Sequence, residues 1–169
     1  MAFFSLQDDL AGGSRKGWVR YQNDQGDFEI LYPEYFSFSL GADGVYSVGE
    51  FFPQPGAAIA TVAFPRNSFP ETNFSHAFLT VALSDEVVTA GECQLMRRPG
   101  EIEGKFFDET KEVNGVTFHV GQFDGAAAGT LAETRVYHTL HKGKCFGVSL
   151  NLFTFNIDNF ELGEVREVK

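Results

Sequence analysis

The clearest hydrophobic pattern in the chain runs from Asp108 to Phe155, where apolar and polar residues alternate in segments separated by short turns. Asn114-Gly115 and Lys142-Gly143 each lie between two such segments. Asn-Gly is a strong hairpin signal because both central residues of a type I′ turn need a positive φ. The region therefore predicts an antiparallel meander of about four strands. The apolar face of its first hairpin would carry Val113, Val116, Phe118 and Val120.

The register of the last hairpin has two solutions. A two-residue loop at Lys142-Gly143 pairs Tyr137 with Val148. A three-residue loop instead pairs Leu140 with Phe146 and matches the apolar faces better. Turn chemistry favours the first register and side-chain packing favours the second, so both stay open.

Shorter alternating segments precede the meander. They predict strands over residues 17–21, 27–33, 36–40, 57–64 and 77–83. A short N-terminal helix is expected before residue 14, since Ser5 can cap it and Gly12-Gly13 can end it. A second short helix is expected over residues 84–96, opened by Ser84-Asp85-Glu86. Residues 164–169 resemble the opening of a third helix.

These elements predict one domain over residues 1–169. It comprises an N-terminal helix or arm at residues 1–14, a sheet core at residues 17–155 and a C-terminal tail at residues 156–169. The expected fold class is α+β, with an antiparallel β-sheet meander flanked by a few short helices. The alternative is a closed β-barrel of lipocalin type, although Gly17-Trp18 lacks the spacing of the G-x-W signature of that family.

Composition adds two unusual features. The chain has 19 Phe against 1 Trp and 5 Tyr, and its net charge is −10. The acidic balance argues against nucleic acid and against an anionic membrane surface, both of which require clustered Lys and Arg. No apolar run approaches the ~20 residues of a membrane-spanning helix. The N-terminus also lacks the basic start and apolar stretch of a signal peptide.

The excess of phenylalanine implies a thick core, a lined cavity or an exposed binding surface, of which core packing is the commonest. Several Phe residues stand in adjacent pairs or around the loop Pro65–Phe74. Adjacent side chains of an extended segment point to opposite sides, so one of each pair tends to face outward. The candidate residues for binding a ligand or partner are Phe51, Phe52, Phe64, Phe69 and Phe74.

Cys93 and Cys145 lie in separate predicted elements. A disulfide between them would close a long loop, stabilise the fold by ~3–5 kcal/mol and indicate a periplasmic or secreted protein. Two separate buried thiols, which would favour the cytoplasm, are the alternative. A third possibility is Cys145 as a nucleophile beside a histidine base, but no oxyanion or orienting motif accompanies it. The candidate bases are His119, His138 and His141.

No metal, cofactor or catalytic motif is expected. His138 and His141 are three residues apart, so they point to opposite faces of a strand and do not converge on zinc. The segment Asn23–Asp27 with Glu29 has the oxygen donors of a calcium loop without the EF-hand register. G-x-S-x-G and the phosphate-binding glycine motifs are absent from the sequence. Asn73-Phe74-Ser75 is a glycosylation sequon.

The segment Gly26–Phe36, G-D-F-E-I-L-Y-P-E-Y-F, resembles the start of the PsbP/Mog1 superfamily. Glu133–His138 followed by Gly143–Phe146 is similar to uncharacterised bacterial secreted or lipoprotein-type domains. The resemblance covers residues 17–155 and implies an α-β-α sandwich with a non-catalytic accessory or binding role. It carries no functional residues over. The superfamily usually closes with a long helix, and this sequence ends where that helix would begin.

The sequence favours a non-catalytic binding or accessory module, not an enzyme, that uses an aromatic surface or cleft. Its expected partner is an unknown protein or an apolar small ligand. It is expected to act outside the cytoplasm if the disulfide forms, without inserting into a membrane. The alternatives are a Cys/His-based hydrolase or thiol enzyme and a structural domain of a larger protein.

Overall fold

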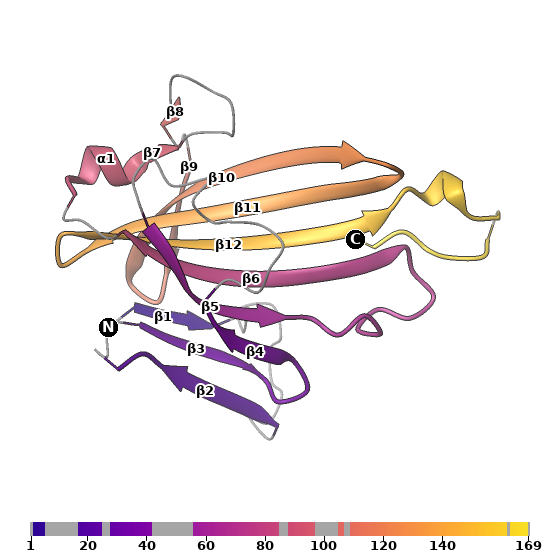
Figure 1. Cartoon of the computed structure of the whole chain (residues 1–169). Helices are drawn as coiled ribbons and strands as arrows, with labels where there is room; N and C mark the ends of the chain where they lie inside the picture. Colours follow the sequence, from indigo (N-terminus) through magenta and orange to yellow (C-terminus); the bar gives the residue numbers. More distant parts are fainter. Residues whose placement is uncertain are drawn as a thin grey trace.

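The computed structural model describes residues 2–5, 17–24, 28–41, 56–84, 88–96, 105–106, 109–161 and 163–168. These residues form mainly β-strands, with one α-helix, α1 (Ala90–Gln94), and one 3-10 helix, η3 (Ile157–Asn159) (Figure 1). The strands are β1 (Ala2–Ser5), β2 (Trp18–Gln22), β3 (Phe28–Pro33), β4 (Ser37–Leu40), β5 (Gly56–Ala63), β6 (Phe74–Ser84), β7 (Leu95–Met96), β8 (Lys105–Phe106), β9 (Glu109–Val113), β10 (Val116–Ala127), β11 (Thr130–His141) and β12 (Lys144–Phe155).

The strands build one large sheet and two small ones. The large sheet has seven strands in the order β4-β5-β6-β12-β11-β10-β9, and every neighbouring pair is antiparallel. A three-stranded sheet of order β1-β3-β2 lies beside it (Figure 1), and β1 pairs parallel with β3. Strands β7 and β8 form the third sheet. Strands β9 to β12 are the meander that the alternating pattern predicts.

Three two-residue turns set the register of this meander. In each turn a residue with φ near 50° precedes a glycine with φ near 77°, which is the backbone of a type I′ hairpin. The turns are Asn114-Gly115, Ala128-Gly129 and Lys142-Gly143, with φ values of 51° and 77°, 49° and 79°, and 51° and 76°. Tyr137 therefore pairs with Val148, so turn chemistry, and not the best match of apolar faces, decides the last register.

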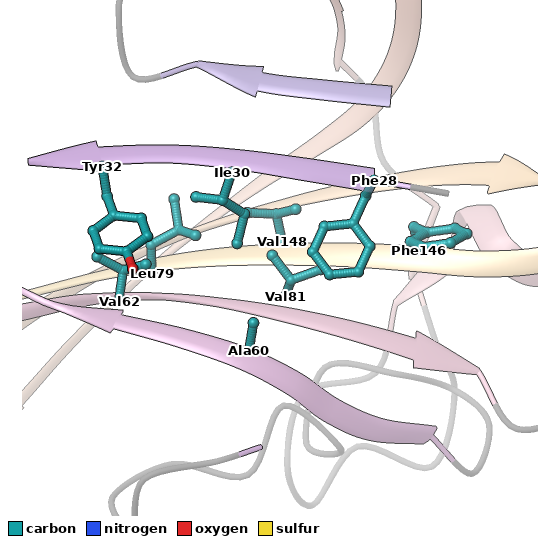
Figure 2. Close-up of a cluster of buried hydrophobic side chains, with 9 residues drawn as sticks. All are labelled: Phe28, Ile30, Tyr32, Ala60, Val62, Leu79, Val81, Phe146 and Val148. Carbon is teal, nitrogen blue, oxygen red and sulfur yellow. The ribbon is translucent and has the colours of Figure 1, made fainter. Parts of the chain in front are cut away.

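The main core lies between the three-stranded sheet and the seven-stranded sheet. Phe28, Ile30 and Tyr32 alternate along β3, so all three side chains face the large sheet (Figure 2). Burying an apolar side chain of this size stabilises the fold by about 1.5–3 kcal/mol. Opposite them lie Ala60 and Val62 of β5, Leu79 and Val81 of β6, and Phe146 and Val148 of β12.

The expected α+β class is wrong, because the described residues are predominantly strand and their helices are confined to α1 and η3. The closed barrel of lipocalin type is also wrong. Within the described residues the seven-stranded sheet is open, with β4 and β9 as its edges. Phe28 and Phe146, with the partly buried Phe36 and Phe38, pack in the core between the two sheets.

The structure differs from all three expected helices in the residues that it describes. Ala2–Ser5 forms β1, because pairing with the edge of β3 satisfies its backbone; residues 6–14 lie outside the described residues. Of residues 84–96, only α1 is helical, and Ser84 ends β6. Near the C-terminus, Arg166 forms a parallel bridge with Thr72 in place of a helix.

Candidate functional site

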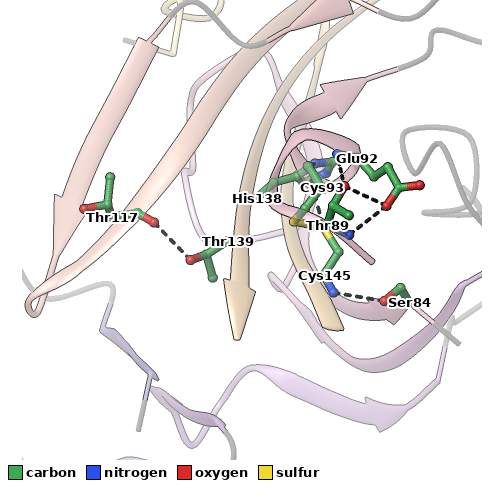
Figure 3. The surroundings of a disulfide bond; sticks show 8 residues. All are labelled: Ser84, Thr89, Glu92, Cys93, Thr117, His138, Thr139 and Cys145. Atoms are coloured by element: carbon green, nitrogen blue, oxygen red, sulfur yellow. Dashed lines mark hydrogen bonds between the residues drawn. A yellow bond between two sulfur atoms is a disulfide. The ribbon is translucent and has the colours of Figure 1, made fainter. Parts of the chain in front are cut away.

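A disulfide joins Cys93 of α1 to Cys145 of β12 at one end of the seven-stranded sheet, here called the disulfide end (Figure 3). Both cysteines are buried, and the S–S distance is 2.05 Å. The predicted bridge is confirmed. The alternatives of two separate thiols and of Cys145 as a nucleophile are wrong, because no thiol remains free.

His138 lies beside the disulfide and is completely buried. Its Nδ1 is 3.0 Å from the carbonyl oxygen of Cys93. A carbonyl oxygen only accepts, so Nδ1 carries the proton and donates it. The pKa of His138 is lowered to about 4, mainly by burial; the hydrogen bond to the Cys93 carbonyl acts in the opposite direction and the neighbouring His119 in the same direction as burial. His138 is therefore a neutral structural side chain that holds α1 against β11 at neutral pH.

The other histidines do not gather into a site. His119 pairs with His138 across β10 and β11, whereas the ring of His141 packs edge-on against Phe146 at 6.0 Å, on the other face of the sheet. In the described ranges no three His, Cys, Asp or Glu side chains are grouped so that they could hold a metal ion.

Helix α1 is anchored by a capping box that sequence inspection missed. The backbone N–H of Thr89 donates to Glu92 Oε2 at 2.7 Å, and the N–H of Glu92 donates to Thr89 Oγ1 at 3.3 Å. The Thr89 N–H and the Thr89 hydroxyl, which also donates to Glu92 Oε2 at 2.7 Å, together lower the pKa of the Glu92 carboxyl. The N–H of Val88 also donates to the carbonyl of Gly143 at 2.7 Å. The spacing T-x-x-E would have located the start of this helix.

Two of the described donors of the possible calcium loop, Asn23 and Glu29, contact other residues of the fold. Asn23 Oδ1 accepts a hydrogen bond from the N–H of Phe28 at 3.1 Å, closing the β2–β3 turn. Glu29 is buried and lies 3.4 Å from the Nε of Arg20. Residues 25–27 lie outside the described residues. The described oxygen atoms therefore do not converge on a cation.

The candidate phenylalanines divide into core and surface residues. Phe51 and Phe52 lie outside the described residues. Phe64 packs on Phe36 with ring centroids 4.4 Å apart. Phe69 stands edge-on to Phe74 at 5.0 Å; Phe74 is buried, whereas Phe69 is 43% exposed. Of the described candidates, Phe69 is therefore the most available for binding.

All three exposed aromatic side chains of the described residues lie at the end of the sheet opposite the disulfide. They are Tyr35 (67% exposed), Phe69 (43%) and Phe155 (43%). Ser37 pairs with Ala63, so the β3–β4 turn that carries Tyr35 lies beside the end of β5. The N–H of Phe155 donates to the carbonyl of Asn73 at 2.8 Å, which brings the end of β12 to the β5–β6 loop. These three residues with Phe36, Phe64 and Phe160 are called the aromatic end.

The aromatic end is built from segments far apart in the chain, which is why sequence inspection found Phe69 but missed Tyr35 and Phe155. The ring of Tyr35 packs edge-on to Phe36 at 4.9 Å, and Phe155 packs edge-on to Phe160 at 6.3 Å. Leu131, which pairs with Thr154 next to this surface, is also exposed. Exposed carboxylates on the same loops are those of Glu34, Glu71, Asp158, Glu161 and Glu164.

Comparisons with protein-family models, with curated proteins and with solved structures found no match to this chain. The resemblance to the PsbP/Mog1 superfamily therefore stays a prediction. Among the described residues, no helix is long and apolar enough to cross a membrane.

Proposed function

We propose that this protein is a non-catalytic binding module that docks a protein partner on the aromatic end. The observation that supports this is that Tyr35, Phe69 and Phe155, the exposed aromatic side chains of the described residues, come from three separate segments that meet at the same end of the sheet. Tyr and other aromatic residues are enriched among the side chains that contribute most to protein association. Leaving them exposed costs hydrophobic free energy, which a partner would recover by covering them.

The geometry favours a protein over a small apolar ligand. Tyr35 and Phe69 extend from two different loops, the β3–β4 turn and the β5–β6 loop, and neither ring belongs to the buried core cluster between the sheets. A surface of this kind suits a broad contact, whereas small ligands bind in concave pockets. Because exposed carboxylates outnumber the exposed Arg66 and Arg166 on these loops, a partner with a basic rim would associate faster at low salt.

The disulfide end supports a location outside the cytoplasm for this module. Disulfides persist in oxidising compartments, and the Cys93–Cys145 bridge is buried within the fold. We therefore place the module in the periplasm or outside the cell. A Cys145-based enzyme has no free thiol.

Photo-crosslinking from the aromatic end in the native host tests this function. A photoreactive phenylalanine analogue at position 69 should yield a discrete crosslinked protein, and the same analogue at position 140 should not. Leu140 is the matched control because it is also exposed but lies near the disulfide end. Equal products from both positions, or none from position 69, would contradict the proposal. A product containing only this chain would instead indicate self-association.

Once the crosslinked partner is purified, the contribution of individual side chains to the binding free energy can be measured. Phe69→Ala should weaken binding by about tenfold or more, as expected for an aromatic residue that dominates an interface. Leu140→Ala should leave the Kd within about twofold, since isolated exposed apolar residues contribute little. Titration calorimetry or surface plasmon resonance measures both. Equal effects of the two variants would remove the aromatic end from the interface.

A further inference from the structure

The C-terminal segment Gly163–Val168 runs along the loop that carries Phe69. Thr72 and Arg166 form a parallel bridge. The N–H of Arg166 donates to the carbonyl of Glu71, and the N–H of Asn73 donates to the carbonyl of Arg166, each at 2.9 Å. The guanidinium of Arg166 also lies 3.6 Å from the Glu71 carboxylate. The two segments are thus paired through their backbones, about ninety residues apart in the chain.

Asn73 is the residue at which three segments meet. It is 1% exposed, and its side-chain Nδ2 donates to the carbonyl of Phe155 at 2.8 Å. Its Oδ1 accepts from the N–H of Val168 at 2.9 Å, and its backbone carbonyl accepts from the N–H of Phe155 at 2.8 Å. One buried amide therefore joins the β5–β6 loop, the end of β12 and the C-terminal segment.

The loop itself is held in a constrained conformation next to this junction. Glu71 has φ of 59°, in the left-handed region that non-glycine residues seldom adopt. Such a conformation persists only when its surroundings enforce it. Here the enforcement includes the hydrogen bond from Arg166 and the bond from Thr72 Oγ1 to the carbonyl of Phe69 at 2.7 Å. The second bond connects the junction to the backbone of Phe69, whose ring is exposed.

We propose that Asn73 and the segment Gly163–Val168 form a strap that fixes the β5–β6 loop in the conformation that presents Phe69. Asn73 is then a positioning residue of the aromatic end. The strap as a structural unit is independent of any partner, whereas its role in presenting Phe69 rests on the proposed function. Asn73, the first residue of the glycosylation sequon, would therefore have a structural role, because its side-chain Nδ2 and Oδ1 both already form hydrogen bonds.

Hydrogen exchange of the full chain tests the strap without a partner. Asn73→Ala should speed exchange of the Arg166, Val168 and Phe155 amides by at least about tenfold, as the loss of a buried hydrogen bond implies. Amides of the β6–β12 ladder should keep their rates. Asn67→Ala is the matched control, since Asn67 is exposed in the same loop, and it should change none of these rates. Unchanged Arg166 and Val168 rates in Asn73→Ala would overturn the strap.

Two further variants separate positioning from general stability. Asn73→Asp keeps the acceptor for Val168 but loses the donor to Phe155, so Val168 should stay protected. Loss of Val168 protection in this variant would contradict the assigned roles of the two amide groups. If Asn73→Ala does not fold, Arg166→Pro removes one donor of the strap from an exposed position, and it should speed exchange at Val168 and Asn73. Unchanged rates there would also overturn the strap.

Crosslinking from position 69 in the Asn73→Ala background links the strap to binding. A lower yield, with β6–β12 exchange unchanged, is the expected result. A strap confirmed by exchange together with an unchanged yield would overturn the positioning role alone. If the chain that keeps Asn73 gives no crosslink from position 69, the proposed function is contradicted. The hydrogen-exchange result for the strap is not affected by that outcome.

Discussion

Different interactions hold the chain segments in place at the two ends of the seven-stranded sheet (Figure 1). At the disulfide end, a covalent bond, a buried neutral His138 and a capping box hold α1 against the strands. At the aromatic end, hydrogen bonds centred on Asn73 hold the loop and the C-terminal segment. The first end buries His138 and a disulfide, and the second leaves three aromatic rings in solvent.

The difference between the two ends shows that a short segment depends on the bonds that attach it to the rest of the fold. A helix of five residues is too short to be stable alone, so α1 needs the covalent bond and the contacts beside it. The β5–β6 loop is held by pairing with distant backbone, which leaves side chains such as Phe69 free to face outward. The disulfide end therefore contributes stability, and the aromatic end contributes a surface.

Removing the disulfide should cause the largest loss of stability. The bond closes a loop of 52 residues, for which the chain-entropy model predicts a loss of about 4 kcal/mol in the free energy of unfolding. The double variant Cys93→Ala with Cys145→Ala, or full reduction, should show this loss in urea denaturation. The hydrogen-exchange rates of the Arg166 and Val168 amides should rise only by the amount that the lower free energy of global unfolding causes. A loss below about 1 kcal/mol would show that α1 is held without the crosslink.

Acid should weaken the disulfide end next most strongly. The pKa of His138 falls from 6.5 in the unfolded chain to about 4 in the fold, because burial disfavours the imidazolium. The unfolded chain thus binds this proton more tightly. The associated stability is complete above pH 6.5 and is lost as the pH falls toward 4, by about 3 kcal/mol.

The measurement is the free energy of unfolding in urea at pH 7 and at pH 4. His138→Asn is the control, since an amide can still donate to Cys93 but does not titrate. It should lose about 3 kcal/mol less than the natural chain over this range. Equal losses in both proteins would show that His138 does not carry the pH dependence.

The smallest expected effect is at the β10–β11 turn, which adjoins the aromatic end. Ala128 has φ of 49°, and the carbonyl of Gly129 accepts from Asn159 Nδ2 at 3.1 Å. Ala128→Asn recreates the Asn-Gly pair of the β9–β10 turn and should stabilise the fold by about 0.5–1 kcal/mol, because Asn tolerates this backbone better. Asn114→Ala should destabilise it by a similar amount. Thermal denaturation measures both, and a stabilising Asn114→Ala would contradict this explanation.

Local signals predicted much of the meander and the bridge. Asn114-Gly115 forms the expected two-residue turn, and Lys142-Gly143 forms the one of its two open registers that turn chemistry favoured, because a type I′ turn is specified by its own two residues. The alternation of Phe28, Ile30 and Tyr32 likewise located a core face. These features depend on neighbours in the chain, so they can be recognised without knowledge of the fold.

The aromatic end was predicted only in part. Phe69 was found because it lies in a loop rich in proline and phenylalanine. Tyr35 and Phe155 join it through pairings of β4 with β5 and of β12 with the β5–β6 loop, which no local pattern reveals. Asn73 carried a glycosylation sequon, and only its burial and its two side-chain hydrogen bonds show a structural role.

The sequence by itself determined the Asn114-Gly115 hairpin, the β3 core face and the candidate pair of cysteines, because each follows from spacing along the chain or from residue chemistry. Tertiary structure decided that Ala2–Ser5 is a strand, that Arg166 pairs with Thr72 and that the sheet formed by the described strands is open. Those outcomes depend on which backbone edges are available for pairing after the core has formed. Capping residues and acidic turns favour a helix weakly, and hydrogen bonding to an existing strand outweighs them.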